Sequence, residues 1–349
     1  MTPDGAPVSR WPAPSAQGAA GAGLAVLVNA NAKRGGRRVA VQIARALPGA
    51  SVRLTKSTAE IDAWLRVLPR LRGFMAAGGD GSAVALVNAL ARITPPDEPL
   101  PPMGILPLGT GNGWAHALGA PKLHFCLDRL ASKGDALPTR RCGLVEVEGT
   151  LAQFAGTGWD AMILDDYKKQ LESSRGPGRR FSKSVYGYVT AALLRTTPRV
   201  AWHGNPRVVI ENLGDEVYEA GPGGCPRKMV GTGRGAILYE GPFGTASVGT
   251  CPEFGYRFKA FPLAERMPGY INVRAYDRGA LRAVTAIPRL WSGKHPLPGM
   301  HDWWATRVRM TFSRPVPLQI GGDAHGMRRS IDYAAAQRSV RMVDWRRMG

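Results

Sequence analysis

The sequence predicts an α/β domain built on a parallel sheet, followed by a second domain of antiparallel strands. Between residue 24 and about residue 143, short apolar runs alternate with helical patterns, as they do in parallel sheets covered by helices. After that point, polar and apolar residues alternate in short stretches separated by Gly and Pro, which favours an antiparallel sheet or β-sandwich. A chain of 349 residues also suits two hydrophobic cores better than one.

Four strands and four helices are expected to alternate in the first domain. The first helix carries an apolar stripe and ends at Pro48 and Gly49. The second follows a capping-box pattern, in which Glu60 comes three residues after Ser57. The expected strands cover residues 24–28, 51–54, 74–77 and 103–107, and the expected helices cover residues 37–47, 58–68, 82–93 and 114–118.

The second domain is expected to be mostly strand, with one helix at 184–195. Its expected strands cover residues 144–147, 207–211, 270–275, 307–312 and 316–320. Residues 1–23 are rich in Pro, Ala, Gly and Ser and lack the apolar centre of a secretory signal, so we expect a disordered tail. No apolar run is long enough to predict a membrane-spanning helix.

The composition indicates an anionic partner and argues against metal-binding or disulfide-rich folds. The net charge is +20, which fits nucleic acid or an anionic lipid surface, and also fits solvated Arg side chains with no specific partner. The four Cys form no C-x-x-C pair and the six His form no H-E-x-x-H motif. A zinc site or disulfide framework is therefore not expected, and a reducing compartment fits.

The most informative motif is Gly78-Gly79-Asp80-Gly81-Ser82, which lies between an expected strand and an expected helix. Glycines let the backbone approach a phosphate closely, and the start of a helix offers free N–H groups. An acid in such a loop can hold Mg²⁺ or take a proton from an attacking hydroxyl. The alternative is a tight turn in which Asp80 serves as a helix cap.

A second loop, Leu108-Gly109-Thr110-Gly111-Asn112, follows the next expected strand. A third, at 29–36, contains Lys33 and follows the first strand, while Thr55 ends the second strand. Because parallel strands present their carboxyl ends at one edge, these groups are expected to converge there. Together they predict a nucleotide phosphate site, although neither a P-loop nor a G-x-G-x-x-G motif occurs at these positions.

The two glycine loops, in this order and separation, resemble the diacylglycerol kinase catalytic family. This family includes bacterial lipid kinases, sphingosine kinases and ceramide kinases, with NAD kinases as distant relatives. The resemblance covers about residues 24–160 and resumes at 319–326. It implies an α/β nucleotide domain at 24–143, a β-sandwich lipid-substrate domain at 144–335, and a final segment, 336–349, that returns to the first domain.

The resemblance also implies roles for individual residues. Asp80 would lie close to the acceptor hydroxyl, with Asp323 as a second catalytic acid and a ligand of Mg²⁺. Asp160 would face the lipid head group, or would be a plain turn residue. The residues that would contact ATP are Asn29, Lys33, Thr55, Gly79, Asp80, Gly81, Ser82, Gly109, Thr110, Gly111 and Asn112.

The sequence departs from the family pattern at two places where acids are usual. Val84-Ala85 replaces Asn-Glu in the helix after the first glycine loop, and Gly321-Gly322-Asp323 replaces Asp-Gly-Glu near the C-terminus. Asp323 could take over the role of the glutamate. If it does not, the protein would be a catalytically silent sensor of nucleotide or lipid, and an NAD kinase-like enzyme is a further alternative.

A basic segment at 165–183 completes the sequence-based hypothesis. Its cations include Arg179 and Arg180, which could reach the substrate, or the segment could be a solvated loop. Basic residues at an anionic membrane each contribute about 1 kcal/mol of binding. We therefore expect an ATP-dependent, Mg²⁺-dependent lipid kinase in the cytoplasm, peripherally associated with the inner face of the membrane. Its acceptor would be diacylglycerol, a sphingoid base or ceramide, with no nucleic-acid partner and an oligomeric state that the sequence does not determine.

Overall fold

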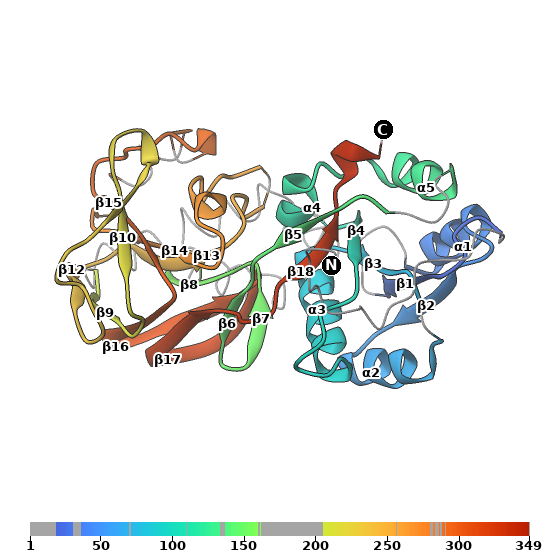
Figure 1. Cartoon of the computed structure of the whole chain (residues 1–349), viewed down its shortest axis with the longest axis horizontal. Coiled ribbons are helices and arrows are strands. Elements are labelled where there is room, and N and C mark those ends of the chain that lie inside the picture. The colour runs from blue at the N-terminus through green and yellow to red at the C-terminus, as the bar shows by residue number, and fades with distance from the viewer. Residues whose placement is uncertain are drawn as a thin grey trace, which may run out of the picture. The chain divides into compact units, whose positions relative to one another are not determined.

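The structure is a computed structural model, and it divides into two compact units (Figure 1). The first unit is Met1–Cys142 with Arg338–Gly349, and the second is Gly143–Gln337. The described residues are 19–30, 36–69, 71–109, 111–132, 137–159, 161, 205–255, 257–279, 282, 286, 288–289 and 291–348. Most of the expected tail, the expected helix at 184–195 and the basic segment at 165–183 lie outside them.

The described part of the first unit contains a six-stranded sheet in the order β2-β1-β3-β4-β18-β5. Strands β1 to β4 are parallel, which confirms the predicted fold class. Every side chain from Leu24 to Val28 in β1 is buried, as expected for a parallel strand covered on both faces. The strands are β1 (Leu24–Asn29), β2 (Ser51–Thr55), β3 (Gly73–Gly78), β4 (Met103–Pro107), β5 (Thr139–Cys142) and β18 (Val340–Val343).

Helices connect these strands, and the start of α2 follows the capping chemistry of the sequence. At the start of α2, Ser57 Oγ accepts a hydrogen bond from Glu60 N at 3.3 Å, as the capping-box pattern predicts. Glu60 in turn accepts from Lys56 N, one residue earlier than the ideal motif. The helices are α1 (Gly36–Ala46), α2 (Thr58–Val67), α3 (Asp80–Ile93), α4 (Gly113–Ala117) and α5 (Leu123–Ser132).

The C-terminal segment crosses back into the first unit. Strand β18 pairs in parallel with β4 and antiparallel with β5, and the 3₁₀ turn η4 (Trp345–Arg347) follows it. Trp345 is fully buried, and its carbonyl accepts a hydrogen bond from Arg129 at 2.8 Å. Residues more than 200 positions apart in the sequence thus share one core.

The second unit is antiparallel throughout its described strands, which confirms the other half of the predicted fold class. Hydrogen bonds join twelve of them into a sheet, in which the long strand β16 pairs with β8, β9 and β17. The strands expected at 307–312 and 316–320 are both parts of β16, separated by a bulge. No helix within the described residues is long and apolar enough to span a bilayer.

The twelve strands are β6 (Val145–Val147), β7 (Thr150–Ala152), β8 (Phe154–Gly158), β9 (Arg207–Asn212), β10 (Val217–Ala220), β11 (Pro226–Lys228), β12 (Ile237–Pro242), β13 (Thr245–Gly249), β14 (Ile271–Tyr276), β15 (Met300–Ala305), β16 (Arg307–Ile320) and β17 (Asp323–Ala335). Two 3₁₀ turns, η2 (Pro222–Gly224) and η3 (Ala264–Arg266), interrupt the loops between them.

Candidate functional site

The carboxyl ends of β1, β2, β3 and β4 meet at one edge of the parallel sheet. Asn29 ends β1 directly beside Thr55, which ends β2 and is buried. The Asn29 amide donates to Ser82 Oγ at 3.0 Å, which connects the end of β1 to the first turn of α3. The expected convergence of polar groups at this edge is therefore present in the structure.

The two glycine loops contact each other through their backbones. Leu108 N and Gly109 N both donate to the carbonyl of Gly78, at 2.9 and 3.2 Å. A Cβ atom placed on Gly109 would lie only 2.5 Å from Gly79 Cα and 2.8 Å from Asn112 Oδ1. Any larger residue at position 109 would therefore push the two loops apart.

We expect Gly109→Ala to lower the free energy of unfolding by about 1–3 kcal/mol, because overpacked sites must shift backbone or side chains. Thermal denaturation measures this change. Gly233→Ala is the matched control, since a Cβ there would meet nothing within 4 Å and its φ is not positive. Equal melting temperatures for the two variants would contradict the close packing of the loops.

Asp80 joins the first loop to the helix that follows the second. Its Oδ2 accepts from Gly113 N and its Oδ1 accepts from Trp114 N, both at 2.9 Å. These are the first two N–H groups of α4, which have no partner within the helix itself. Asp80 thus caps α4, a helix 33 residues further along the chain, whereas the N-cap of α3 is Gly79 and makes no side-chain cap bond.

Burial raises the pKa of the Asp80 carboxyl from 3.8 to about 6, although the hydrogen bonds from Trp114 and Gly113 oppose this rise. The group is therefore mostly ionised at neutral pH but close enough to neutrality to exchange a proton. A general base is most effective when its pKa lies near the working pH.

Asn112 shapes the second loop. It adopts a left-handed conformation with φ 49°, which Asn tolerates better than most residues, and its amide donates to the carbonyl of Gly109 at 2.8 Å. Gly111 precedes it, directly before the start of α4. The Asn112 side chain therefore helps to hold the loop at the sheet edge.

The structure places most of the predicted site residues together in the first unit. These are Asn29, Thr55, Gly79, Asp80, Gly81, Ser82, Gly109, Gly111 and Asn112. Lys33, Thr110, Asp160, Arg179 and Arg180 lie outside the described residues. Asp323 is exposed in the second unit, at the start of β17, after a turn in which Gly321 and Gly322 have positive φ angles.

Two participants at the sheet edge were not predicted, namely the backbone N–H groups of Gly113 and Trp114. The predicted helix began at Trp114, whereas α4 begins at Gly113. The available signal was a small residue directly after Asn112, which allows the chain to turn into a helix close to the first loop. Likewise, α3 begins at Asp80 rather than at residue 82, so the acid is part of the helix.

Comparison with known proteins shows a family similarity in the first unit. Residues 23–136 match the diacylglycerol kinase catalytic domain. The resemblance to that family is confirmed. A stretch of 54 residues, 16% of this chain, is 50% identical to "Eye-specific diacylglycerol kinase" of Drosophila melanogaster and covers 4% of that protein.

A longer similarity relates this chain to "Probable lipid kinase YegS-like" of Serratia proteamaculans. The two are 29% identical over 167 residues, which is 46% of this chain and 52% of that protein. The chain thus matches about half of the length of one curated relative and a small part of the other.

Solved structures share the fold over nearly the whole chain. A crystal structure of a diacylglycerol kinase from Bacillus anthracis has a TM-score of 0.57 and 14% identity, and covers 93% of this chain and 98% of its own. Another crystal structure from the same organism has a TM-score of 0.65 and 15% identity. It covers 96% of this chain and 99% of its own. At such identities the likeness describes the fold and not the activity.

Proposed function

We propose that this protein is an ATP-dependent lipid kinase that transfers the γ-phosphoryl group of ATP to a hydroxyl group of a membrane lipid. The observation that carries the proposal is the pair of glycine loops packed backbone to backbone at the carboxyl edge of the sheet. The match of residues 23–136 to the diacylglycerol kinase catalytic domain supports the same reaction. Diacylglycerol, a sphingoid base and ceramide are the proposed acceptors.

The phosphates of ATP would bind at the start of α3. This helix has 14 residues, and its first turn leaves N–H groups without intrahelical partners and at the positive end of the helix dipole. Gly79 precedes the helix, so the backbone there can approach a phosphate without a side chain in the way. Ser82 and Asn29, already hydrogen-bonded to each other, would add side-chain polar groups beside the phosphates.

Asp80 would act on the acceptor hydroxyl. In the proposed step the lipid oxygen forms a bond to the γ-phosphorus, the bond from that phosphorus to the β–γ bridging oxygen breaks, and ADP leaves. The hydroxyl proton passes to Asp80, which is ionised at neutral pH. The hydrogen bonds from Gly113 and Trp114 fix the orientation of the carboxylate while leaving further lone pairs on its oxygens.

The proposed Mg²⁺ would be held mainly by the phosphates of ATP. No cluster of three or more His, Cys, Asp or Glu suited to a metal occurs among the described residues. This fits Mg²⁺, which is commonly bound through one or two carboxylates together with substrate phosphates and water. Asp323 is the carboxylate that we propose for it, and the bound ion would neutralise charge on the phosphates.

The absence of two usual acids favours a second candidate function, a catalytically silent nucleotide sensor. Val84 and Ala85 are half-buried side chains of α3 that cannot hold a metal, and Asp323 is the acid left in the C-terminal motif. A sensor would bind ATP in the same loops without transferring phosphate. Measuring ATP binding and transfer separately distinguishes the two functions.

Saturating Mg-ATP should raise the melting temperature of the protein, because a ligand that binds only the native state stabilises it by mass action. The stabilisation is about 2.7 kcal/mol at a free concentration 100 times the Kd. Differential scanning fluorimetry with Mg-ATP, Mg-ADP and Mg²⁺ alone measures it. No shift with either nucleotide, together with no heat of binding by calorimetry, would contradict the proposed nucleotide site.

A further inference from the structure

A row of aromatic side chains in the second unit runs from the core to the surface. Phe154 is buried, and its ring stacks on that of Phe254 with centroids 4.1 Å apart. Phe254 contacts Phe258 edge to face, and Phe258 contacts Trp291 in the same way at 5.6 Å. Trp291 is 43% exposed, so the row ends in a large apolar side chain that faces solvent.

The surroundings of Phe258 and Trp291 are basic. Arg257, Lys259, Arg289 and Lys294 are all exposed, and no Asp or Glu occurs in the sequence between 254 and 264 or between 278 and 301. The two segments lie against each other, because a Cβ on Gly293 would be 2.9 Å from Lys259 Cδ. We call Phe258, Trp291 and these four cations the aromatic–basic surface.

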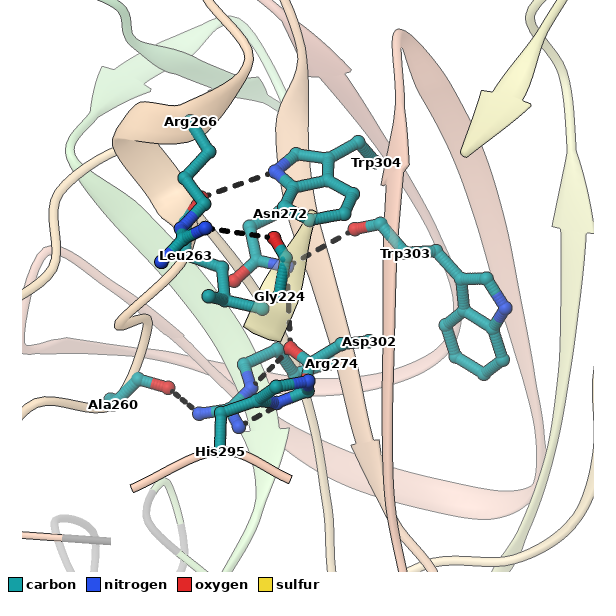
Figure 2. A network of polar contacts seen from close by, with 10 residues as sticks. All are labelled: Gly224, Ala260, Leu263, Arg266, Asn272, Arg274, His295, Asp302, Trp303 and Trp304. Carbon is teal, nitrogen blue, oxygen red and sulfur yellow. Dashed lines mark hydrogen bonds and ion pairs between the residues drawn. The ribbon is translucent and has the colours of Figure 1, made fainter. Parts of the chain in front are cut away.

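One buried ion pair holds both segments in place (Figure 2). Arg274 and Asp302 pair through two contacts, Nε to Oδ1 at 2.6 Å and Nη2 to Oδ2 at 3.1 Å, and both side chains are almost fully buried. Arg274 also donates to the carbonyl of Ala260, two residues from Phe258. His295, which is four residues after Trp291, has its Nδ1 atom 3.4 Å from Asp302 Oδ2. The buried ion pair thus contacts both segments that carry the aromatic–basic surface.

We infer that the aromatic–basic surface docks onto a lipid bilayer that contains anionic lipid. Trp is enriched at the boundary between headgroups and acyl chains, where its ring is buried and its N–H remains hydrated. Neighbouring Lys and Arg side chains are attracted to anionic headgroups. Single-stranded nucleic acid could also stack on aromatic rings between cations, and the choice of a bilayer rests on the proposed function, which places the acceptor in a membrane.

The test is co-sedimentation of the full chain with vesicles, without ATP or an acceptor lipid, so that its outcome does not depend on phosphoryl transfer. Wild type should bind phosphatidylserine-containing vesicles more tightly than phosphatidylcholine vesicles, and salt should weaken the binding. Trp291→Ala should weaken it about tenfold, as burial of a large apolar side chain predicts. Each cation at an anionic surface changes partitioning about fivefold, so Lys259→Glu with Lys294→Glu should weaken it by at least about 25-fold.

The matched control replaces Arg53 and Arg234 with Glu, which changes the net charge equally at exposed positions elsewhere. Its vesicle binding should stay within about threefold of wild type if local contacts matter more than total charge. Equal weakening by both pairs of substitutions would overturn the inference, as would unchanged vesicle binding by natively folded Trp291→Ala. Binding of a fluorescent single-stranded oligonucleotide that depends on Trp291, with no vesicle binding, would overturn it in favour of nucleic acid.

Discussion

Asp80→Asn is expected to reduce lipid phosphorylation by at least the 10²- to 10⁴-fold that a single general base contributes. The substitution keeps the size of the side chain and one of its two hydrogen-bond acceptors, but it removes the charge and the base. The measurement is the initial rate of transfer from labelled ATP at saturating substrates, with circular dichroism to verify the fold. Full activity of Asp80→Asn would contradict the assignment of Asp80.

The structure offers a competing role for Asp80, because both carboxylate oxygens accept N–H groups of α4. If the carboxylate only positions the loops, Asp80→Asn should raise the KM for ATP and leave kcat near its wild-type value. If it is the base, kcat should fall while ATP affinity changes little. The KM-against-kcat split therefore separates the two roles.

The pH dependence of wild-type turnover gives an independent check. The pKa of Asp80 is raised to about 6 in the folded protein, so kcat should decline as the pH falls through 6 and the base becomes protonated.

The free energy of unfolding should change with pH in the opposite direction to kcat. The folded state holds this proton more tightly than the unfolded state, so ionisation of Asp80 costs stability as the pH rises from about 4 to about 6.

The largest loss of stability is expected from Arg274→Ala in the second unit. Removing one partner of a buried ion pair leaves the other charge buried without its counter-ion, which costs about 3–5 kcal/mol. Asp302 would lose both contacts with Arg274, and Ala260 would lose its donor. Urea denaturation followed by circular dichroism measures the change.

Arg309→Ala is the control for Arg274→Ala. Arg309 pairs with Asp332 through two contacts, at 2.7 and 3.0 Å, but its side chain is 45% exposed, so water can replace the partner. The urea midpoint of this variant should remain near that of wild type. Similar midpoints for Arg274→Ala and Arg309→Ala would show that burial does not control the energetics of these pairs.

Acid titration provides a further test of the Arg274–Asp302 pair. Burial opposes ionisation of Asp302, but attraction to Arg274 and the contact with His295 outweigh it, so the pKa of this carboxyl lies below its ordinary value of 3.8. A carboxyl whose folded pKa is depressed stabilises the protein above its unfolded pKa and loses that contribution as the pH falls. The stability gap between wild type and Arg274→Ala should therefore narrow below about pH 4.

The sequence was sufficient to predict the alternating strands and helices of the first unit, because their patterns are local. Buried runs such as Leu24–Val28 and the Ser57–Glu60 cap require only neighbouring residues to be recognised. The edge where the strands end was also predictable, because in a parallel sheet the carboxyl ends of the strands converge at one edge. Helix α5 was missed although Leu123, Cys126, Leu127 and Leu130 have helical spacing.

Contacts that depend on tertiary register could not be predicted. Asp80 contacts α4 across more than 30 residues of sequence, and no local pattern marks that contact. Arg274 and Asp302 are direct partners on the neighbouring strands β14 and β15. Their spacing of 28 residues carries no periodic signal.

The measurement that tests the central proposal most directly is transfer of labelled γ-phosphate from ATP to a panel of lipids in mixed micelles. The panel contains diacylglycerol, a sphingoid base and ceramide, and each reaction is run with and without Mg²⁺. We predict Mg²⁺-dependent labelling of at least one of these lipids by the wild-type protein. Confirmed binding of Mg-ATP with no labelled lipid in any reaction would contradict the kinase proposal and favour the nucleotide sensor.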